Sequence, residues 1–426
     1  MTSRRSPTAK LLRMLGPGLL TGAADDDPSG IATYSQSGAQ LGYALCWTMF
    51  LTTPFMVAIQ IVSARIGSVT GRGLADNLRQ TLPPIALYGV VALLAAANIF
   101  NIAADIAAMA AAVRLLIGGP AFLYVLGFGL FCLTAQIVIP YRPYAQFMKL
   151  LTLVLFAYVA TAFSVHVPWG DVLAATFVPQ LSWNRDFILM LVAVVGTTIS
   201  PYLFFWQASL EVEDRRLKER RKEAALRNAE QSTQRRLRPI AIDTWIGMTL
   251  SNVIGFFIIV ATAATLHVHG TATINTAADA AAALRPLAGT LAFVLFSLGI
   301  IGTGLLAIPA LAGSVAYAVA ETFGWKSSLG MLPRRARGFY LLIGGATSIG
   351  ALGALTPINP IRMLVWSAVL NGIVAVPLMA AMMIVIGNSG IMGKFAASRT
   401  LAIFGWLATL LMGVIVAAFF LISAMA

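Results

Sequence analysis

The chain has 426 residues, of which 59% are hydrophobic and only 11% are charged, and its formal net charge is +13. Soluble domains carry roughly 25% charged residues, so the composition excludes a soluble enzyme, a disordered protein and a nucleic-acid-binding domain as descriptions of the whole chain. Cys46 and Cys132 lie inside apolar runs and provide no disulfide framework or CxxC motif. The basic start, residues 1–10, leads into a segment interrupted by charge, which argues against a cleavable signal peptide.

Apolar segments that are long enough to cross a membrane recur along the whole chain. A helix needs about 20 apolar residues to cross the hydrocarbon core. Eleven segments are predicted to do so, at residues 15–40, 43–66, 85–117, 121–139, 145–166, 187–210, 240–266, 287–320, 339–355, 361–386 and 401–425. We therefore predict an all-α protein that forms a single membrane domain over residues 1–426.

Basic residues are strongly biased towards one side of these predicted spans. With the N-terminus in the cytoplasm, 25 of the 29 Lys and Arg residues fall in cytoplasmic segments. The four on the other side are Arg114, Arg185, Arg285 and Arg362. Because Lys and Arg resist translocation, the bias predicts a multi-pass protein of the cytoplasmic (inner) membrane with a cytoplasmic N-terminus. A missed or invented span would scramble this alternation, so the bias also supports eleven spans.

The longest polar stretch, residues 211–239, holds ten basic residues between Arg215 and Arg238. We interpret it as a charged, partly helical cytoplasmic loop that helps to set the orientation of the protein. Contact with anionic lipid headgroups is the alternative role for this loop.

The first predicted span carries acidic and helix-breaking residues in the middle of its apolar sequence. This part reads Thr21-Gly22-Ala23-Ala24-Asp25-Asp26-Asp27-Pro28-Ser29-Gly30. An ionised side chain at bilayer depth is unfavourable unless it faces protein or water, and Pro28 removes a backbone donor and clashes with the preceding turn. We therefore predict an unwound stretch between two half-helices, lining a cavity.

The sixth predicted span has a matching interruption, Gly196-Thr197-Thr198-Ile199-Ser200-Pro201-Tyr202. Pro28 and Pro201 are 173 residues apart (201 − 28), and the two spans begin 172 residues apart (187 − 15), so the breaks fall at matching depths. Each copy contains five spans, so the second copy enters the membrane in the opposite direction. This pattern predicts an inverted repeat of about 15–166 and 187–386, with an extra span at 401–425. Secondary transporters bind their substrate at the midplane between such breaks.

The charge of the first break favours a cation as the substrate. The C-terminal end of a half-helix exposes carbonyl groups and the negative end of the helix dipole, and Asp27 adds a carboxylate. Amino-acid carriers of similar architecture present half-helix N-termini to a substrate carboxylate, which three acidic residues would repel. A metal cation is therefore favoured, and an amino-acid or organic-cation carrier on the same scaffold is the alternative.

Several of these motifs resemble those of the Nramp divalent-metal transporters. The resemblance rests on Gly16-Pro17-Gly18, Asp27-Pro28, Gly42-Tyr43 and Trp47, which are similar to the first-helix region of the family. Ser200-Pro201-Tyr202 stands where the family carries Met-Pro-His. The resemblance implies a LeuT-type fold with broken helices one and six, and import of a divalent transition metal that is usually coupled to protons.

The departures from the family pattern indicate a divergent, Mg²⁺- or Mn²⁺-handling branch. The family signature Asp-Pro-Gly-Asn is here Asp27-Pro28-Ser29-Gly30, so Gly30 replaces an asparagine ligand. Ser200 replaces a methionine, and a hydroxyl favours harder cations than a thioether does. Tyr202 replaces a histidine, and the glutamate of a family Asp-x-x-Glu pair is here Ala108. The last two changes remove groups associated with proton movement in the family, so proton coupling is not predicted.

The paired breaks lead to a set of predicted metal ligands. We predict that Asp27 binds the metal directly, with the Thr197 carbonyl opposite it. Gly196, Ser200 and Asp26 complete the set. For Asp25 and Asp26, capping of the first half-helix or hydration is the alternative to direct ligation.

Asp105, Tyr202 and Asn371 are candidates for the ion pathway. Asp105 shares one face of the third span with Asn98 and Asn101, and a structural polar cluster explains this face equally well. For Asn371 on the tenth span, hydrogen bonding between helices is the preferred explanation. The same two explanations apply to the polar residues of the seventh span, Asp243 and Asn252.

Together these patterns predict a secondary transporter of divalent metal cations that works by alternating access, with Mn²⁺, Mg²⁺ and Fe²⁺ as candidates. The metal is the cargo, no cofactor is expected, and the expected partners are this metal and the lipid bilayer, without nucleic acid. We expect no enzymatic activity, and the absence of a Walker A motif argues against ATP hydrolysis. A channel or sensor is a further alternative. A membrane enzyme is another, although it needs a second cluster of His or acidic ligands that the sequence does not provide.

Overall fold

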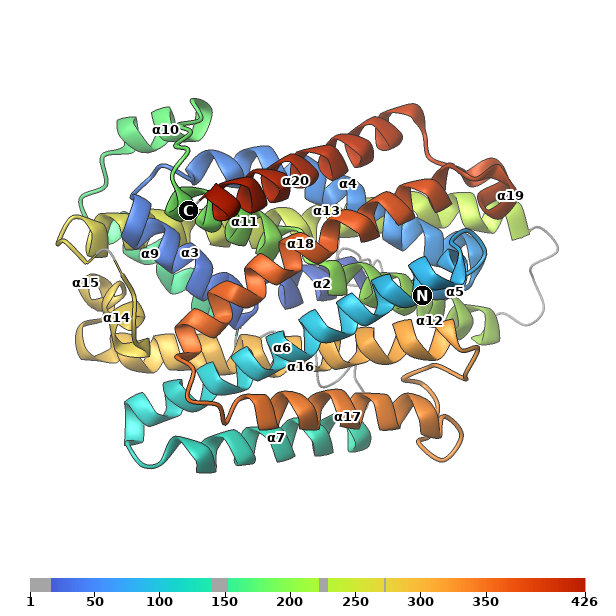
Figure 1. Cartoon of the computed structure of the whole chain (residues 1–426), viewed down its shortest axis with the longest axis horizontal. Coiled ribbons are helices and arrows are strands. Elements are labelled where there is room, and N and C mark those ends of the chain that lie inside the picture. Colours follow the sequence, from blue (N-terminus) through green and yellow to red (C-terminus); the bar gives the residue numbers. More distant parts are fainter. Residues whose placement is uncertain (1–16, 140–151, 222–228, 272, 426) are drawn as a thin grey trace, which may run out of the picture.

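The computed structural model describes residues 17–139, 152–221, 229–271 and 273–425, and every regular element within these ranges is a helix (Figure 1). The main helices are α2 (Pro17–Asp25), α3 (Pro28–Leu41), α4 (Cys46–Thr70), α5 (Leu74–Leu78), α6 (Pro84–Ile117), α7 (Ala121–Val138), α9 (Phe156–Ser164), α10 (Trp169–Phe177), α11 (Arg185–Thr198), α12 (Pro201–Arg221), α13 (Ala229–Thr262), α14 (Ala277–Ala282), α15 (Arg285–Ala288), α16 (Ala292–Thr322), α17 (Arg337–Gly353), α18 (Pro360–Gly387), α19 (Ser389–Met392) and α20 (Arg399–Met425). The basic residues predicted to be cytoplasmic in segments 1–16, 140–151 and 222–228 lie outside the described residues.

Eight helical segments of the described chain are long and apolar enough to cross a membrane. A bent pair, Leu153–Ser164 with Trp169–Phe177, makes a ninth if it counts as one span. The eight correspond to predicted spans two, three, four, six, seven, eight, ten and eleven. Predicted spans one and nine match the interrupted pair α2–α3 and the 17-residue helix α17, while predicted span five begins outside the described residues. The all-α class is confirmed, and the number of eleven spans stays a prediction.

Both predicted helix breaks are present. α2 ends at Asp25 and α3 begins at Pro28, while α11 ends at Thr198 and α12 begins at Pro201. Proline cannot continue a helix because it lacks the N–H and clashes with the preceding turn, but it suits the first position of a new helix. The two breaks therefore have the same length and the same sequence cause.

The two broken helices run in opposite directions between the two ends of the molecule. In Figure 1, α3 leads from the middle towards the end that carries α14, and α12 leads from the middle towards the end that carries α5. We refer to these as the α14 end and the α5 end. The opposite directions agree with the inverted arrangement predicted from the two breaks.

The broken helices are enclosed by long continuous ones. α13 packs against α2, α3 and α4, whereas α16 packs against α6, α17 and α12. α18 lies against both α6 and α11, so it bridges the two groups. The last helix, α20, packs against α4, α11 and α18 and lies at the edge of the bundle in Figure 1.

The contact between α2 and α13 depends on glycines. A Cβ atom added to Gly22 would overlap the backbone of Gly247, and one added to Gly18 would lie 2.6 Å from the backbone nitrogen of Thr244. Small residues allow helix backbones to approach closely inside membranes. The first half-helix is thereby seated directly on α13.

We expect Gly22→Ala to destabilise the protein, because overpacking of this kind costs about 1–3 kcal/mol. The measurement is the melting temperature of the purified full chain in detergent. Gly89→Ala in α6 is the matched control, since no atom lies within 4 Å of its added Cβ and alanine is about 1 kcal/mol better than glycine inside a helix. Equal melting temperatures for the two variants would contradict the close α2–α13 contact.

Candidate metal centre

Asp27 connects the first break to its surroundings. It is the N-cap of α3, and its Oδ1 accepts hydrogen bonds from the Ser29 hydroxyl at 2.6 Å and the Gly30 N–H at 2.8 Å. Its Oδ2 accepts a bond from the Asn101 amide of α6 at 3.3 Å. A helix N-terminus stabilises a carboxylate through its free N–H groups and its dipole. The fold therefore holds the Asp27 carboxyl group, which is only 2% exposed, among hydrogen-bond donors in the interior of the membrane domain.

The second break presents uncharged oxygen atoms. Ile199 leaves the helical conformation with φ −116° and ψ 69°. The Ser200 hydroxyl turns back and donates to the Thr197 carbonyl at 2.8 Å. This carbonyl has a second lone pair, and the Ser200 oxygen keeps its own lone pairs. The Thr197 hydroxyl oxygen is buried and has no partner within the described residues.

The two breaks face each other, as predicted. The Tyr202 hydroxyl at the start of α12 donates to the Ala24 carbonyl near the end of α2 at 2.7 Å. The hydroxyls of Tyr34 and Thr198 are 3.3 Å apart. A Cβ on Gly30 would lie 3.3 Å from Thr197 Oγ1, so the position of the family asparagine borders the second break.

Asp25 and Asp26 share a single hydroxyl. Ser251 Oγ, on α13, lies 2.7 Å from Asp25 Oδ2 and 2.8 Å from Asp26 Oδ1. A hydroxyl donates only one hydrogen bond. The second contact therefore requires a proton on one of the two carboxyl groups. Asp26, a predicted ligand, is thus held towards α13, with 5% of its surface exposed.

The atoms around the breaks that are available to bind a metal are oxygen atoms. Within the described residues, no three His, Cys, Asp or Glu side chains converge on one point. Any ion at the breaks would therefore combine the Asp27 carboxylate with carbonyl, hydroxyl and amide oxygens or with water. Hard divalent cations prefer such ligands.

Several predicted residues have structural roles instead. The Asn98 amide donates to the Leu311 carbonyl at 3.1 Å, and the Asn252 amide donates to Thr53 Oγ1 at 2.7 Å. Asp243 accepts the Gly18 N–H at 2.7 Å and so caps the start of α2. Gly196 allows close packing, because a Cβ there would overlap the Ala368 carbonyl of α18. Gly196 has no side chain, so its predicted role as a metal ligand concerns its backbone carbonyl oxygen only.

The remaining pathway candidates differ in their surroundings. Asp105 is fully buried on α6, and neither of its carboxyl oxygens has a hydrogen-bond partner within the described residues. It is near enough to Asp27 to interact with it electrostatically. Asn371 is also fully buried, and its amide lacks a partner in the described part of the chain. The hydrogen bond between helices that we preferred for Asn371 is therefore not found there.

Sequence reasoning missed two contacts of the site. The sequence does not mark Ser251, which bonds Asp26. It places Asn101 together with Asn98, although only Asn101 reaches Asp27. Asn98 and Asn101 share one face of α6, so periodicity does not separate them. Serine is common in membrane helices, and nothing near Ser251 in the sequence marks it as a partner of acidic residues.

A cavity of about 660 Å³ opens at the α14 end and leads towards the first break. Its lining includes Ala32 on α3, Ala107 and Ala108 on α6, and Leu364 on α18. Ala32 is only four residues beyond Pro28, which is about 6 Å along a helix. Ala108 stands where the family has glutamate, so the wall of this cavity is apolar at that position.

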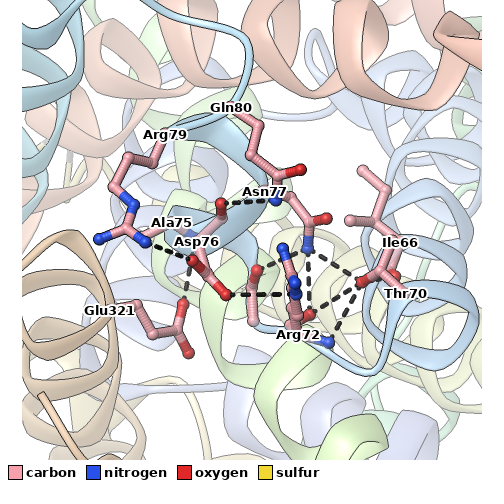
Figure 2. A network of polar contacts seen from close by, with 10 residues as sticks. Ile66, Thr70, Arg72, Ala75, Asp76, Asn77, Arg79, Gln80 and Glu321 are labelled. Carbon is pink, nitrogen blue, oxygen red and sulfur yellow. Dashed lines mark hydrogen bonds and ion pairs between the residues drawn. The ribbon is translucent and has the colours of Figure 1, made fainter. Parts of the chain in front are cut away.

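The α5 end is tied together by polar contacts (Figure 2). The Ala75 N–H of α5 donates to the buried Glu321 carboxylate of α16 at 3.1 Å, and the Asn77 amide donates to the Gly73 carbonyl at 2.7 Å. Asp76 forms ion pairs with Arg72 and Arg79. The hydrogen bond between Ala75 and Glu321 therefore holds α5 against α16.

A second tie joins α12 to α16 and to the loop after it. Glu213 accepts hydrogen bonds from the Tyr317 hydroxyl and, at 2.6 Å, from the Leu329 N–H. A cavity of about 540 Å³ at this end reaches Ser209, which is eight residues beyond Pro201, or about 12 Å along a helix. The aromatic side chains of residues 204–206 are fully buried, although Trp206 lines a smaller cavity of about 260 Å³ that also borders the loop after α16. The breaks are therefore closer to the α14-end cavity.

Two facing breaks in an all-helical membrane domain define the class of broken-helix transporters. Solved structures agree with this fold. The manganese transporter of Eremococcus coleocola, in complex with an aromatic bis-isothiourea compound, matches with a TM-score of 0.71 at 18% identity, over 100% of this chain and 89% of that one. Mhp1, a nucleobase-cation-symport-1 family transporter, matches with a TM-score of 0.55 at 16% identity, over 96% of this chain and 93% of that one.

The chain belongs to the Nramp family, because the model of the natural resistance-associated macrophage protein-like family matches residues 18–422. Curated relatives agree. The divalent metal cation transporter MntH of Verminephrobacter eiseniae is 28% identical over 315 residues, which cover 72% of this chain and 67% of that protein. MntH of Erwinia tasmaniensis is 26% identical, over 92% of this chain and 90% of that protein.

We expect Asn101→Ala to weaken metal binding about tenfold or more, because a hydrogen bond to a charged group contributes about 1.5–3 kcal/mol and positions Asp27. Isothermal titration of Mn²⁺ into the purified full chain measures this change. Asn98→Ala is the matched control: it removes the same amide from the same helix face, but that amide serves the Leu311 carbonyl. If the two variants bound Mn²⁺ equally well, Asn101 would have no role in positioning Asp27.

Proposed function

We propose that this protein is a secondary transporter that moves divalent metal cations across the inner membrane by alternating access. The observation that carries the proposal is the buried Asp27 carboxyl group at one helix break, which the Tyr202–Ala24 hydrogen bond joins to the second, oxygen-lined break. The names of the curated relatives, divalent metal cation transporters, support the same cargo class. Mn²⁺, Mg²⁺ and Fe²⁺ are the candidate ions.

In this proposal the metal binds between Asp27, the Thr197 carbonyl and the Ser200 hydroxyl. Asp26 joins the set through a rotation away from Ser251, and the Gly196 carbonyl is available beside Thr197. Water fills the remaining positions, because Gly30 supplies no side chain where the family supplies an asparagine. Mg²⁺ usually keeps several of its waters when bound, so a site with few protein ligands suits it.

The α5 end is the cytoplasmic one in this proposal. Basic residues gather there at the ends of six helices, namely Arg65, Arg72, Arg79, Arg215, Arg216, Lys326, Arg337 and Arg399. The α14 end carries Arg114, Arg185, Arg285 and Arg362. The positive-inside rule then places the N-terminus in the cytoplasm. The basic stretch 211–239 would also attract anionic headgroups on that side.

With this orientation the described conformation faces outwards. The outer cavity approaches Asp27, and the cytoplasmic side is closed by buried aromatic side chains and by the Glu213 and Glu321 contacts. Release of the metal to the cytoplasm requires these contacts to break. α16 takes part in both the Glu213 and the Glu321 contacts. We therefore expect α16 and the neighbouring α6 to stay in place while the half-helices move relative to them.

We expect Asp27→Ala to abolish metal binding and vesicle uptake, because it removes the carboxylate that the first break and Asn101 hold in place and that is proposed to bind the metal directly. Uptake of Mn²⁺ by proteoliposomes and calorimetric binding measure the two effects. Asp186→Asn, which removes an exposed carboxylate in the first turn of α11, away from both breaks and from the α5 end, serves as the control. Wild-type uptake by Asp27→Ala would reject the site. Binding of leucine or a polyamine by the wild-type protein, without any metal binding, would favour the organic carrier instead.

We expect millimolar Mg²⁺ to inhibit Mn²⁺ uptake by the wild-type protein, because a hydroxyl at residue 200 does not select softer metals. Ser200→Met should reduce this inhibition about tenfold, which corresponds to about 1.4 kcal/mol of added preference for Mn²⁺. Competition curves at fixed Mn²⁺ measure the change. Complete indifference of the wild-type protein to Mg²⁺ would refute this account of selectivity.

A further inference from the structure

Asn371 on α18 is the buried amide that the site described above leaves unexplained. Its side chain is fully buried, and both its Oδ1 and its Nδ2 lack a hydrogen-bond partner within the described residues. Asn98 and Asn252 are equally enclosed, yet each of their amides donates to a neighbouring helix. Buried amides in native structures are nearly always paired. An unpaired one at this depth therefore indicates a partner that the protein chain does not supply.

The position of Asn371 on its helix places it below the outer cavity. Ile361 and Leu364, near the start of α18, line that cavity. Residues seven apart lie on the same side of a helix, two turns or about 10.5 Å from each other. Asn371 follows Leu364 by seven residues, so it lies on the cavity face of α18, two turns deeper.

The same relation holds on α6, where the deeper residue belongs to the site. Ala108 lines the cavity, and Asn101, seven residues deeper from the α14 end, donates to Asp27. α6 and α18 pack against each other. Asn101 and Asn371 therefore occupy corresponding levels on two neighbouring helices. Asn101 lies beside Asp27, and Asn371 has no partner in the part of the chain that the structure describes.

Contacts of the next residue fix the depth of Asn371 independently. A Cβ on Gly196 would lie 2.6 Å from the Gly372 backbone nitrogen. Residue 371 is therefore close to the level of Gly196, just before the second break, where the Thr197 hydroxyl oxygen also lacks a partner within the described residues. α18 also packs against α3, the helix that Asp27 caps.

We propose that the Asn371 amide is a further specificity-determining group for the transported cation. Its oxygen accepts a hydrogen bond from a water of the hydrated ion, or binds the ion itself, on the cavity side of Asp27. In both cases the ligand is a hard divalent cation with part of its water shell, which fits the few protein ligands at the breaks. This inference rests on the proposed function and adds a contact from the tenth predicted span.

Asn371→Ala and Asn371→Asp, compared with the wild-type protein, test the role. Mn²⁺ and Mg²⁺ are titrated calorimetrically into the purified full chain, and melting temperatures are recorded with and without metal. We expect Asn371→Ala to weaken binding of both ions about tenfold, without lowering the melting temperature of the metal-free protein. Asn371→Asp should restore or exceed wild-type affinity, because a carboxylate replaces the amide oxygen.

A structural role would give the opposite result. In that case Asn371→Ala would lower the metal-free melting temperature, as Asn98→Ala is expected to do, and would leave both affinities unchanged. That outcome overturns the inference. Asp27→Ala, measured in the same titrations, keeps the two proposals apart: lost binding in Asp27→Ala with wild-type binding in Asn371→Ala removes only the role of Asn371. Wild-type binding in Asp27→Ala removes the site itself.

Discussion

A charged carboxylate in the interior of a membrane protein is costly unless hydrogen-bond donors or water face it, and the structure around the first break answers this constraint. Asp27 meets it through the start of α3 and the Asn101 amide. Interrupting the helix is what makes N–H groups available at that depth, since a continuous helix would use them internally. At the first break, the interrupted helix and the polar residue of α6 therefore act together to stabilise the Asp27 carboxyl group.

The rest of the fold serves to hold the two breaks against each other. The first half-helix, α2, packs against α13 through glycines, and Asp243 of α13 caps the start of α2. α18 approaches α11 at Gly196, directly before the second break. Tyr202 then joins the two, because its hydroxyl binds the carbonyl of Ala24. In the family this position is histidine, so the chain keeps a polar link between the breaks while giving up a group that titrates near neutral pH.

The two ends of the molecule differ in how they are closed. The α14 end contains a cavity whose deeper wall includes several alanines. At the α5 end, the carboxyl groups of Glu213 and Glu321 accept hydrogen bonds from backbone N–H groups of other elements and hold these elements together. Such contacts lie near water and can be exchanged for hydration, whereas the glycine contacts within the bundle cannot. In the proposed alternating-access cycle, the polar contacts at the α5 end are therefore the ones that we expect to open.

The all-helical class and the two breaks follow from the sequence, because hydrophobic length and proline act locally along the chain. The side that faces the cytoplasm stays a prediction from the basic residues. Local patterns do not specify which distant side chains meet. Asn101 and Asn98 share one helix face, yet only Asn101 lies beside Asp27, 74 residues away. Ser251 reaches Asp25 and Asp26 across more than 220 residues. Asn371 differs from Asn98 and Asn252 in that neither atom of its amide has a partner within the described residues. These distinctions depend on how helices rotate and approach when they pack, so only the tertiary structure decided them.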